Sequence, residues 1–348
     1  MNTIFNINNL VRANVAKLKP YSSARDEYTS NGSKMVFLDA NENPFENGVN
    51  RYPDPQQRNL KQRLGEVKGI STENILLGNG SDEVLDLIYR AFCEPGEDNI
   101  ISLPPTYGMY QVLADINNIE SREVFLTENF QPNVPEIFKK VDKNTKLIFL
   151  CSPNNPTGNS FQKDIIFKIL NNFKGIVVID EAYIDFSKEE SWSKMLKDFP
   201  NLIVTQTLSK AYGMAGIRLG ICYASEEIIR ILNRIKPPYN VNELTQRKAY
   251  KRLENINEVN LEISDILNER DKLCKVLLQV KFISKIYESD ANFLLVKVDD
   301  ANLRYKQLLE KGVVIRNRTN QPLCENTLRF TVGAREENTA LIDALKSL

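Results

Sequence analysis

The chain has 348 residues, of which 42% are hydrophobic and 26% are charged, so it can bury a large core and a disordered chain is excluded. Its 45 basic and 45 acidic residues give a formal net charge of zero, which excludes a net field that would gather nucleic acid or anionic lipid. Histidine is absent, which excludes Ser-His-Asp and Cys-His chemistry, His-containing zinc sites and an imidazole base, and we expect no metal.

The cysteines and the apolar runs indicate the compartment. The five cysteines are odd in number, far apart and never in a Cys-x-x-Cys arrangement, which is typical of reduced thiols. No uninterrupted apolar run approaches the roughly 20 residues that cross a bilayer, and residues 1–20 lack the apolar centre of a signal peptide. We therefore expect a cytoplasmic protein that does not bind membranes or nucleic acid.

Strand-like and helical patterns alternate through the first two thirds of the chain. Helical periodicity gives apolar faces within 84–91 and within 165–173. Strands separated by helices, and apolar on both faces, indicate a mostly parallel α/β sheet. The predicted strands are 100–103, 147–151, 176–179, 202–204 and 219–223.

The pattern changes after Pro238. A long helical stretch from Val259 to Leu277 leads to predicted strands at 293–298, 313–316 and 328–332, and a last helix follows. These elements indicate a smaller α+β domain that packs on the first. We therefore predict three parts, which are an N-terminal arm at 1–33, a large domain at 34–238 and a small C-terminal domain at 239–348 that packs with the arm.

The segment 207–220, Thr-Leu-Ser-Lys-Ala-Tyr-Gly-Met-Ala-Gly-Ile-Arg-Leu-Gly, directly follows a predicted strand. Lys210 can form an imine with an aldehyde, and Thr207 and Ser209 can donate hydrogen bonds to phosphate oxygens. Arg218 can pair with the phosphate charge. A lone lysine on a turn is usually solvated surface, but this combination predicts a site for an aldehyde that carries a phosphate.

A glycine turn opens the first predicted helix. Gly80, Ser81 and Asp82 follow the apolar pair at 76–77, and Ser81 can cap the helix. The free N–H groups at the helix start suit a phosphate. A capped helix without a ligand explains the turn equally well when it is considered alone.

Polar groups follow two further predicted strands, at the edge of the sheet where ligands bind in parallel folds. Asn155 lies in a proline-rich turn after 147–151, and Asp180 and Tyr183 follow 176–179. Asp180 needs a cation, which is either an arginine in a structural ion pair or a protonated pyridine nitrogen. Taken singly, the turn around Asn155 can also be an ordinary loop.

Eight motifs follow one another nearly from end to end of the chain. They are LDANENP at 38–44, RYPD at 51–54, GSDE at 80–83, PTYGMY at 105–110, NNPTG at 154–158, DEAY at 180–183, TLSK at 207–210 and LRFTVG at 328–333. This ordered set resembles the pyridoxal-phosphate-dependent aminotransferases of the aspartate aminotransferase fold (fold type I). Within that family it is most similar to the enzymes that act on histidinol phosphate.

The resemblance implies a role for each motif residue toward pyridoxal 5′-phosphate. Lys210 would hold the cofactor covalently and then act as the base, and Asp180 would pair with the pyridine N–H. Tyr183 and Asn155 would bind the ring oxygen, and Tyr107 would stack on the ring. The phosphate would be held by Gly80, Ser81, Asp82, Thr207, Ser209 and Arg218. Tyr52 would reach it from the second subunit of a homodimer.

The resemblance places substrate recognition outside the cofactor residues. Arg329 would hold the acidic end of the substrate, with Arg316 and Tyr21 completing an anion pocket, and Asn41 is assigned to the same pocket. Two arginines suit a phosphate ester and can also hold the carboxylates of 2-oxoglutarate. Arg318 lies on the same turn as Arg316 and is the alternative choice.

The activity that the resemblance implies is a transamination in histidine biosynthesis. L-Histidinol phosphate and 2-oxoglutarate would give 3-(imidazol-4-yl)-2-oxopropyl phosphate and L-glutamate. An aromatic-amino-acid aminotransferase or a threonine-phosphate decarboxylase on the same scaffold is the alternative. A regulatory sensor module would need a DNA-binding segment before the motifs, where too few residues stand, and a P-loop phosphotransferase would need a lysine after the glycine turn.

Overall fold

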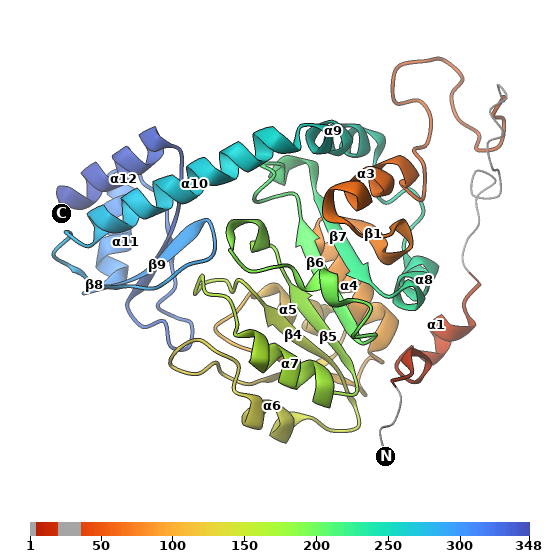
Figure 1. The fold of residues 1–348 in the computed structure, drawn as a ribbon, viewed down its shortest axis with the longest axis horizontal. Coiled ribbons are helices and arrows are strands. Elements are labelled where there is room, and N and C mark those ends of the chain that lie inside the picture. The colour runs from red at the N-terminus through yellow and green to blue at the C-terminus, as the bar shows by residue number, and fades with distance from the viewer. Residues whose placement is uncertain (1–4, 20–35) are drawn as a thin grey trace.

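The computed structural model describes residues 5–19 and 36–348, and two β-sheets with surrounding helices organise them (Figure 1). A seven-stranded sheet forms the centre of the larger part of these residues, and a four-stranded sheet lies in the smaller part. The long helix α10 (Ile256–Leu277) runs across the molecule between the two parts (Figure 1).

The large sheet has the strand order β1-β7-β6-β5-β4-β2-β3. All pairs from β3 to β6 are parallel, and β7 is antiparallel to both of its neighbours, so the predicted mostly parallel sheet is confirmed. Sequence patterns missed β3 because this polar strand has no apolar run. The strands are β1 (Ile75–Asn79), β2 (Asn99–Ser102), β3 (Glu120–Glu123), β4 (Thr145–Cys151), β5 (Ile176–Asp180), β6 (Leu202–Thr207) and β7 (Leu219–Ala224).

Helices cover both faces of the large sheet. Successive side chains of a strand point to opposite faces, so a strand that is apolar throughout needs an apolar partner on each face. In β5, Ile176 and Val178 pack into one apolar core, and Val177 and Ile179 pack into the other. One core includes α4 (Ser81–Phe92), α5 (Met109–Ile116) and α8 (Glu226–Ile235), with α1 (Ala13–Lys17) beside them. The other core includes α3 (Arg58–Lys68), α7 (Lys163–Asn172) and α9 (Glu243–Glu254), with α6 (Val134–Lys140) at its edge.

The small sheet is antiparallel, with the order β10-β11-β9-β8. Its outer face shares a third apolar core with three helices. The strand predicted at 313–316 is wrong in position. Only Arg316 and Asn317 pair with β11, because the N–H of Val313 instead donates to the carbonyl oxygen of Leu308 at the end of α11 (2.9 Å). The elements are β8 (Ile283–Ile286), β9 (Phe293–Val298), α11 (Ala301–Glu310), β10 (Arg316–Asn317), β11 (Thr327–Thr331) and α12 (Arg335–Lys346).

The helix α9 lies after the predicted domain boundary at 238–239 and packs on α3 of the larger part. The guanidinium of Arg63 donates a hydrogen bond to the carbonyl oxygen of Leu253 at 3.0 Å. Ala249 and Leu253 of α9 belong to the same apolar core as Leu60 and Leu64 of α3. The position of the boundary therefore stays a prediction.

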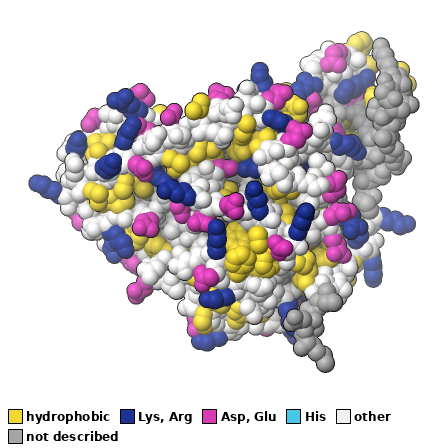
Figure 2. Space-filling model, viewed as in Figure 1, with side chains coloured by type: hydrophobic (Ala, Val, Ile, Leu, Met, Phe, Trp, Pro, Cys, Tyr) yellow, Lys and Arg dark blue, Asp and Glu magenta, His cyan; other side chains and the backbone are white. Residues whose placement is uncertain are grey.

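Charged side chains of both signs are interspersed on the face shown in Figure 2, as the zero net charge leads one to expect. Within the described residues, none of the helices combines the length and the apolar character that a membrane span requires.

Candidate active site

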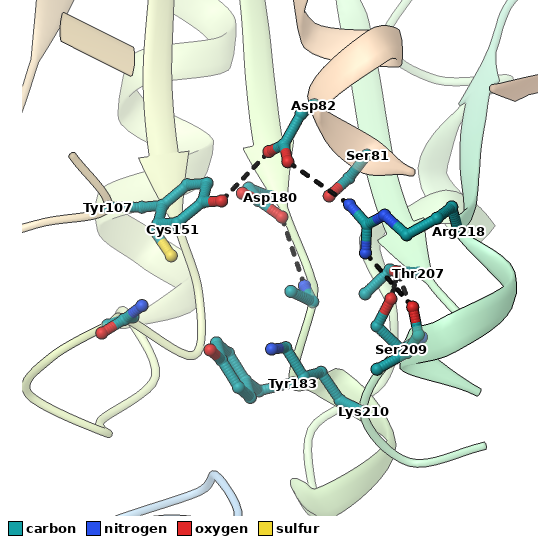
Figure 3. Close-up of a pocket in the computed structure, with 13 residues that line it drawn as sticks. Ser81, Asp82, Tyr107, Cys151, Asp180, Tyr183, Thr207, Ser209, Lys210 and Arg218 are labelled. Carbon is teal, nitrogen blue, oxygen red and sulfur yellow. Dashed lines mark hydrogen bonds and ion pairs between the residues drawn. The ribbon is translucent and has the colours of Figure 1, made fainter. Parts of the chain in front are cut away.

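A pocket opens beyond the carboxyl ends of β4, β5 and β6, where ligands bind in parallel sheets (Figure 3). It encloses about 600 Å³ of empty space, counting its open mouth. Of the residues predicted to bind the cofactor, all line this pocket except Gly80, which lies directly beside it, and Tyr52. The lining residues are Ser81, Asp82, Tyr107, Cys151, Asn155, Asp180, Ala182, Tyr183, Thr207, Ser209, Lys210, Ala215 and Arg218.

The glycine turn before α4 forms one wall of the pocket. Gly80 has a φ of +83° and takes the N-cap position, so the expectation that Ser81 caps the helix is wrong. Ser81 is the first helical residue, and its side chain lines the pocket instead. A Cβ on Gly80 would stand 2.8 Å from Nη2 of Arg218, so any other residue here would push this guanidinium out of its present position.

Hydroxyl, amide and guanidinium groups face the start of α4 from the β6–β7 connection (Figure 3). Oγ1 of Thr207 lies 2.9 Å from Oγ of Ser209 and accepts a hydrogen bond from the Ser209 N–H at 3.1 Å. Nη2 of Arg218 lies 3.7 Å from Oδ2 of Asp82, and this guanidinium is half exposed. The donors on this side form a cradle that suits an anion with several oxygens.

Asp180 closes the floor of the pocket and is buried, with 3% of its surface exposed. Burial raises the pKa of this carboxyl group, and the hydroxyl of Tyr110, which donates to Oδ2 at 2.8 Å, opposes that rise. Within the described part of the chain no arginine or lysine forms an ion pair with Asp180. The first alternative for Asp180, a structural ion pair with an arginine, is therefore absent from the described residues. A buried carboxylate without such a partner suits a cationic ligand.

Lys210 and Tyr183 lie next to one another in the pocket, with the amine of Lys210 directed toward the Tyr183 ring (Figure 3). Nζ of Lys210 lies 5.8 Å from the centre of the Tyr183 ring. Partial burial and the positive charges of Arg329 and Arg218 lower the pKa of Lys210. The neutral amine, which can act as a nucleophile or a base, is therefore more abundant than on a solvated lysine.

The small sheet reaches this pocket through Arg329 on β11. Its Nη1 donates a hydrogen bond to Oδ1 of Asn155, and its guanidinium lies 5.0 Å from the centre of the Phe293 ring. Burial and the charges of Arg318 and Arg316 lower the pKa of Arg329 to about 10, so it stays protonated at neutral pH. Burial also raises the pKa of the Tyr183 phenol, whereas Arg329 and Arg318 lower it.

The other predicted site residues lie elsewhere. Arg316 stands opposite Arg329 in the β10–β11 pairing, with its side chain exposed. Asn41 and Tyr52 line a separate groove, where Tyr52 stacks on Tyr239 with 4.6 Å between the ring centres. Tyr21 lies outside the described residues.

Residues that sequence reasoning did not assign also belong to the pocket region. Tyr110 binds Asp180 from below, and Cys151, Ala182 and Ala215 line the walls. Tyr110 ends the motif at 105–110, so the motif itself carried the signal. The small pocket residues have no such signal, since a side chain that only shapes a wall needs no particular chemistry.

The family model for the class I and II aminotransferases matches residues 28–345 of the chain. A histidinol-phosphate aminotransferase of Christiangramia forsetii is 67% identical over 99% of this chain and 98% of the relative. A histidinol-phosphate aminotransferase of Flavobacterium johnsoniae is 64% identical over the full length of both chains.

Solved structures have the same fold. The histidinol-phosphate aminotransferase from Clostridium acetobutylicum has a TM-score of 0.79 and 26% identity, over 86% of this chain and 90% of the other. The histidinol-phosphate aminotransferase from Sinorhizobium meliloti, solved in complex with pyridoxal 5′-phosphate, has a TM-score of 0.77 and 22% identity, over 85% of this chain and 83% of the other.

Proposed function

The chain belongs to the class I and II aminotransferases, and we propose that it transfers the amino group of L-histidinol phosphate to 2-oxoglutarate. The products are 3-(imidazol-4-yl)-2-oxopropyl phosphate and L-glutamate, and the step serves histidine biosynthesis. The observation that carries the substrate is the 67% identity, over nearly the full length of both chains, to a relative with this activity in its name. All five cysteines are free thiols, which suits a reducing cytoplasm.

The residues of the pocket fit pyridoxal 5′-phosphate. The cradle at the start of α4 offers Ser81, Thr207, Ser209 and Arg218 to a phosphate group, and Gly80 keeps the space that Arg218 occupies. Asp180 is a buried carboxylate that no described cation neutralises, as a site for a protonated ring nitrogen requires. When bound, the cofactor supplies an aldehyde and a ring that withdraws electrons from the reacting carbon.

The pocket side chains then have separate tasks in the reaction. The carboxylate of Asp180 would keep a proton on the ring nitrogen, and the hydrogen bond from Tyr110 holds that carboxyl group in place and favours its ionised form. Nζ of Lys210 would bind the cofactor aldehyde. Once the substrate amine has displaced it from the aldehyde, its lowered pKa would prepare the free amine to accept the proton that leaves the α-carbon of the substrate.

Four further side chains would position the ring and the substrate. The phenol of Tyr183 and the amide of Asn155 would donate hydrogen bonds to the ring oxygen. Arg329 already donates to Oδ1 of Asn155, so a substrate anion bound at Arg329 would lie next to the reacting centre. Tyr107, whose hydroxyl donates to Oδ1 of Asp82 at 3.0 Å, would cover the ring.

A homodimer would complete the site with Tyr52. In the described chain Tyr52 is half exposed and lies in its own groove, away from the pocket that it is proposed to serve. Two large apolar side chains that line this groove, Val49 and Leu244, are also exposed, as are Leu38 and Phe45, which are near it in the sequence. A second subunit would cover these side chains and receive the Tyr52 hydroxyl at its phosphate cradle.

Mixed dimers test the exchange of Tyr52. Lys210→Ala removes the amine that would bind the cofactor, and Tyr52→Ala removes the hydroxyl that would reach the phosphate cradle. Each variant is therefore expected to form homodimers with little activity. If Tyr52 acts across the interface, a dimer with one chain of each variant contains one intact site and recovers up to half of the wild-type activity. If Tyr52 acts within its own chain, no mixed dimer recovers activity and this part of the proposal is wrong.

The substrate is tested by comparing turnover of L-histidinol phosphate with that of phenylalanine, tyrosine and threonine phosphate. We expect the highest kcat/KM for histidinol phosphate, with glutamate formed from 2-oxoglutarate. A negligible rate with histidinol phosphate would overturn the proposal. A high rate with an aromatic amino acid would then indicate an aromatic aminotransferase, and release of carbon dioxide from threonine phosphate would indicate a decarboxylase.

A further inference from the structure

An ion pair between Lys68 and Asp185 lies outside the set of residues that line the pocket. Lys68 is the last residue of α3, and its Nζ lies 2.8 Å from Oδ1 of Asp185. Both side chains are largely buried, with 16% and 20% of their surface exposed. An ion pair in such surroundings is screened less than one on the surface, so it holds its two partners more firmly.

Asp185 belongs to the turn that carries Tyr183. One turn of 3-10 helix at Ile184–Phe186 follows Tyr183 directly, and the N–H of Phe186 donates to the Tyr183 carbonyl oxygen at 3.1 Å. The side chain of Tyr183 lines the pocket. A contact that fixes the carboxylate of Asp185 therefore also limits the movement of the Tyr183 backbone, two residues earlier in the chain.

The other neighbour of Lys68 belongs to the turn that carries Lys210. Nζ of Lys68 lies 5.3 Å from the centre of the Tyr212 ring, within the range of a cation–π contact. The N–H of Gly213 donates to the Lys210 carbonyl oxygen at 3.0 Å and closes the turn around Tyr212. Nε of Arg252 donates to the Tyr212 carbonyl oxygen at 3.1 Å. The ring and the backbone of Tyr212 are thus held by two different cations.

The surroundings of Lys68 keep its ammonium group charged. Burial lowers the pKa of Lys68, but the carboxylate of Asp185 outweighs burial and holds the pKa above its ordinary value. Tyr212, Tyr223 of β7 and Glu181 also lie near this ammonium group. The contacts of Lys68 with both turns therefore persist at neutral pH.

We propose that Lys68 and Asp185 are positioning residues, which hold the turns of Tyr183 and Lys210 at the separation that cofactor binding and proton transfer require. This inference rests on the roles of Lys210 and Tyr183 in the proposed function. The two turns leave different strands, β5 and β6, so their spacing beyond the sheet depends on contacts between them. Misplacement of a reacting group by about 1 Å can cost about 100-fold in rate.

A double variant, Lys68→Met with Asp185→Asn, separates folding from positioning. Removal of one partner leaves an uncompensated charge, whereas replacement of both partners is often tolerated, so we expect the double variant to fold. Its kcat with L-histidinol phosphate should fall by about 10-fold or more. The KM for this substrate should change by less than about threefold, because Arg329 on the small sheet is untouched.

The cofactor gives a readout that does not depend on the substrate. Titration of the apoprotein with pyridoxal 5′-phosphate measures its dissociation constant, and the visible absorbance at saturation measures the share of cofactor that is linked to Lys210. We expect the dissociation constant of the double variant to rise by about threefold or more and its visible absorbance at saturation to fall. Lys68→Arg keeps the positive charge and should stay closer to wild type in both measurements.

The matched control is the double variant Lys146→Met with Asp98→Asn. This Lys–Asp pair has a similar exposure, 19% and 10%, and lies where β2 and β4 begin, at the edge of the sheet opposite the pocket. The positioning role is overturned if kcat, the dissociation constant and the visible absorbance of the Lys68 and Asp185 double variant all lie within about twofold of this control.

Circular dichroism shows whether the double variant folds. If it does not, Asp185→Asn, which keeps the shape of the side chain, is compared with Asp98→Asn by the same criterion. If the wild type does not act on histidinol phosphate, the proposed function fails, and the two cofactor measurements still decide whether Lys68 and Asp185 position Lys210.

Discussion

The hydroxyl of Tyr110 donates a hydrogen bond to Oδ2 of Asp180 at 2.8 Å, beneath the floor of the pocket. Tyr110 is fully buried, its ring is stacked on Phe149 at 4.8 Å, and its backbone carbonyl accepts a hydrogen bond from the hydroxyl of Tyr89. A side chain held on all sides in this way holds Asp180 in one orientation. Its hydrogen bond favours the ionised carboxylate, against the effect of burial on the pKa.

Asp180→Asn should leave the fold intact and remove most of the activity. Asparagine has nearly the same shape but no charge, so the ring nitrogen of the cofactor loses the group that keeps it protonated. We expect kcat to fall by at least about 100-fold. The same change at the exposed Asp164 of α7 is the control, and an Asp180→Asn enzyme as active as this control would contradict the assignment.

Lys210→Ala should abolish both the visible absorbance of the covalently bound cofactor and turnover, because no other described lysine lines the pocket. Absorbance spectra of the purified protein and rates with histidinol phosphate measure the two effects. Lys188→Ala removes an exposed lysine after β5 and should change neither. If Lys210→Ala retains the absorbance of wild type, the cofactor is not bound at this residue.

Gly80→Ala should weaken cofactor binding by about tenfold or more, since a side chain at a φ of +83° costs about 1–3 kcal/mol and its Cβ would stand 2.8 Å from Nη2 of Arg218. Titration of the apoprotein with pyridoxal phosphate gives the dissociation constant. Gly216→Ala is the control in the neighbouring connection, because a Cβ there meets no atom within 4 Å. Equal affinity of the two variants would show that the Gly80 turn is not part of the cradle.

Glu181 should make stability fall as pH rises. Burial raises the pKa of its carboxyl group to about 7, although Ser191, Gln206 and the N–H of Trp192 donate hydrogen bonds to it. The folded state thus holds a proton that the unfolded chain releases near pH 4.5. The contribution of this proton to the free energy of unfolding is complete below pH 4.5 and is lost as pH rises through 7. The total loss is about 3 kcal/mol.

Denaturant unfolding of wild type and Glu181→Gln at pH 5 and pH 8 measures this effect. The free energy of unfolding of wild type should decrease from pH 5 to pH 8 relative to that of Glu181→Gln, which has no such proton. Glu190→Gln, an exposed neighbour, should follow wild type. A constant difference between wild type and Glu181→Gln across this range would mean that Glu181 has an ordinary pKa in the folded state.

Much of the large sheet could be predicted from local patterns. The apolar runs that became β4, β5 and β6 are buried on both faces, and that burial is the reason for the runs. The polar edge strand β3 and the two-residue strand β10 could not be predicted in the same way, because each depends on its pairing partner rather than on its own composition.

The sequence by itself determined which groups stand at the carboxyl ends of neighbouring parallel strands, namely Asn155, Asp180 and Lys210, because such ends meet at one edge of a sheet. Only the tertiary structure decided that Tyr110 supports Asp180 and that Arg329 of the small sheet reaches Asn155. Those relationships depend on strand register and on contacts between distant segments. A shift of one residue in the register of β11 would turn Arg329 to the other face of the small sheet, and local composition does not set that register.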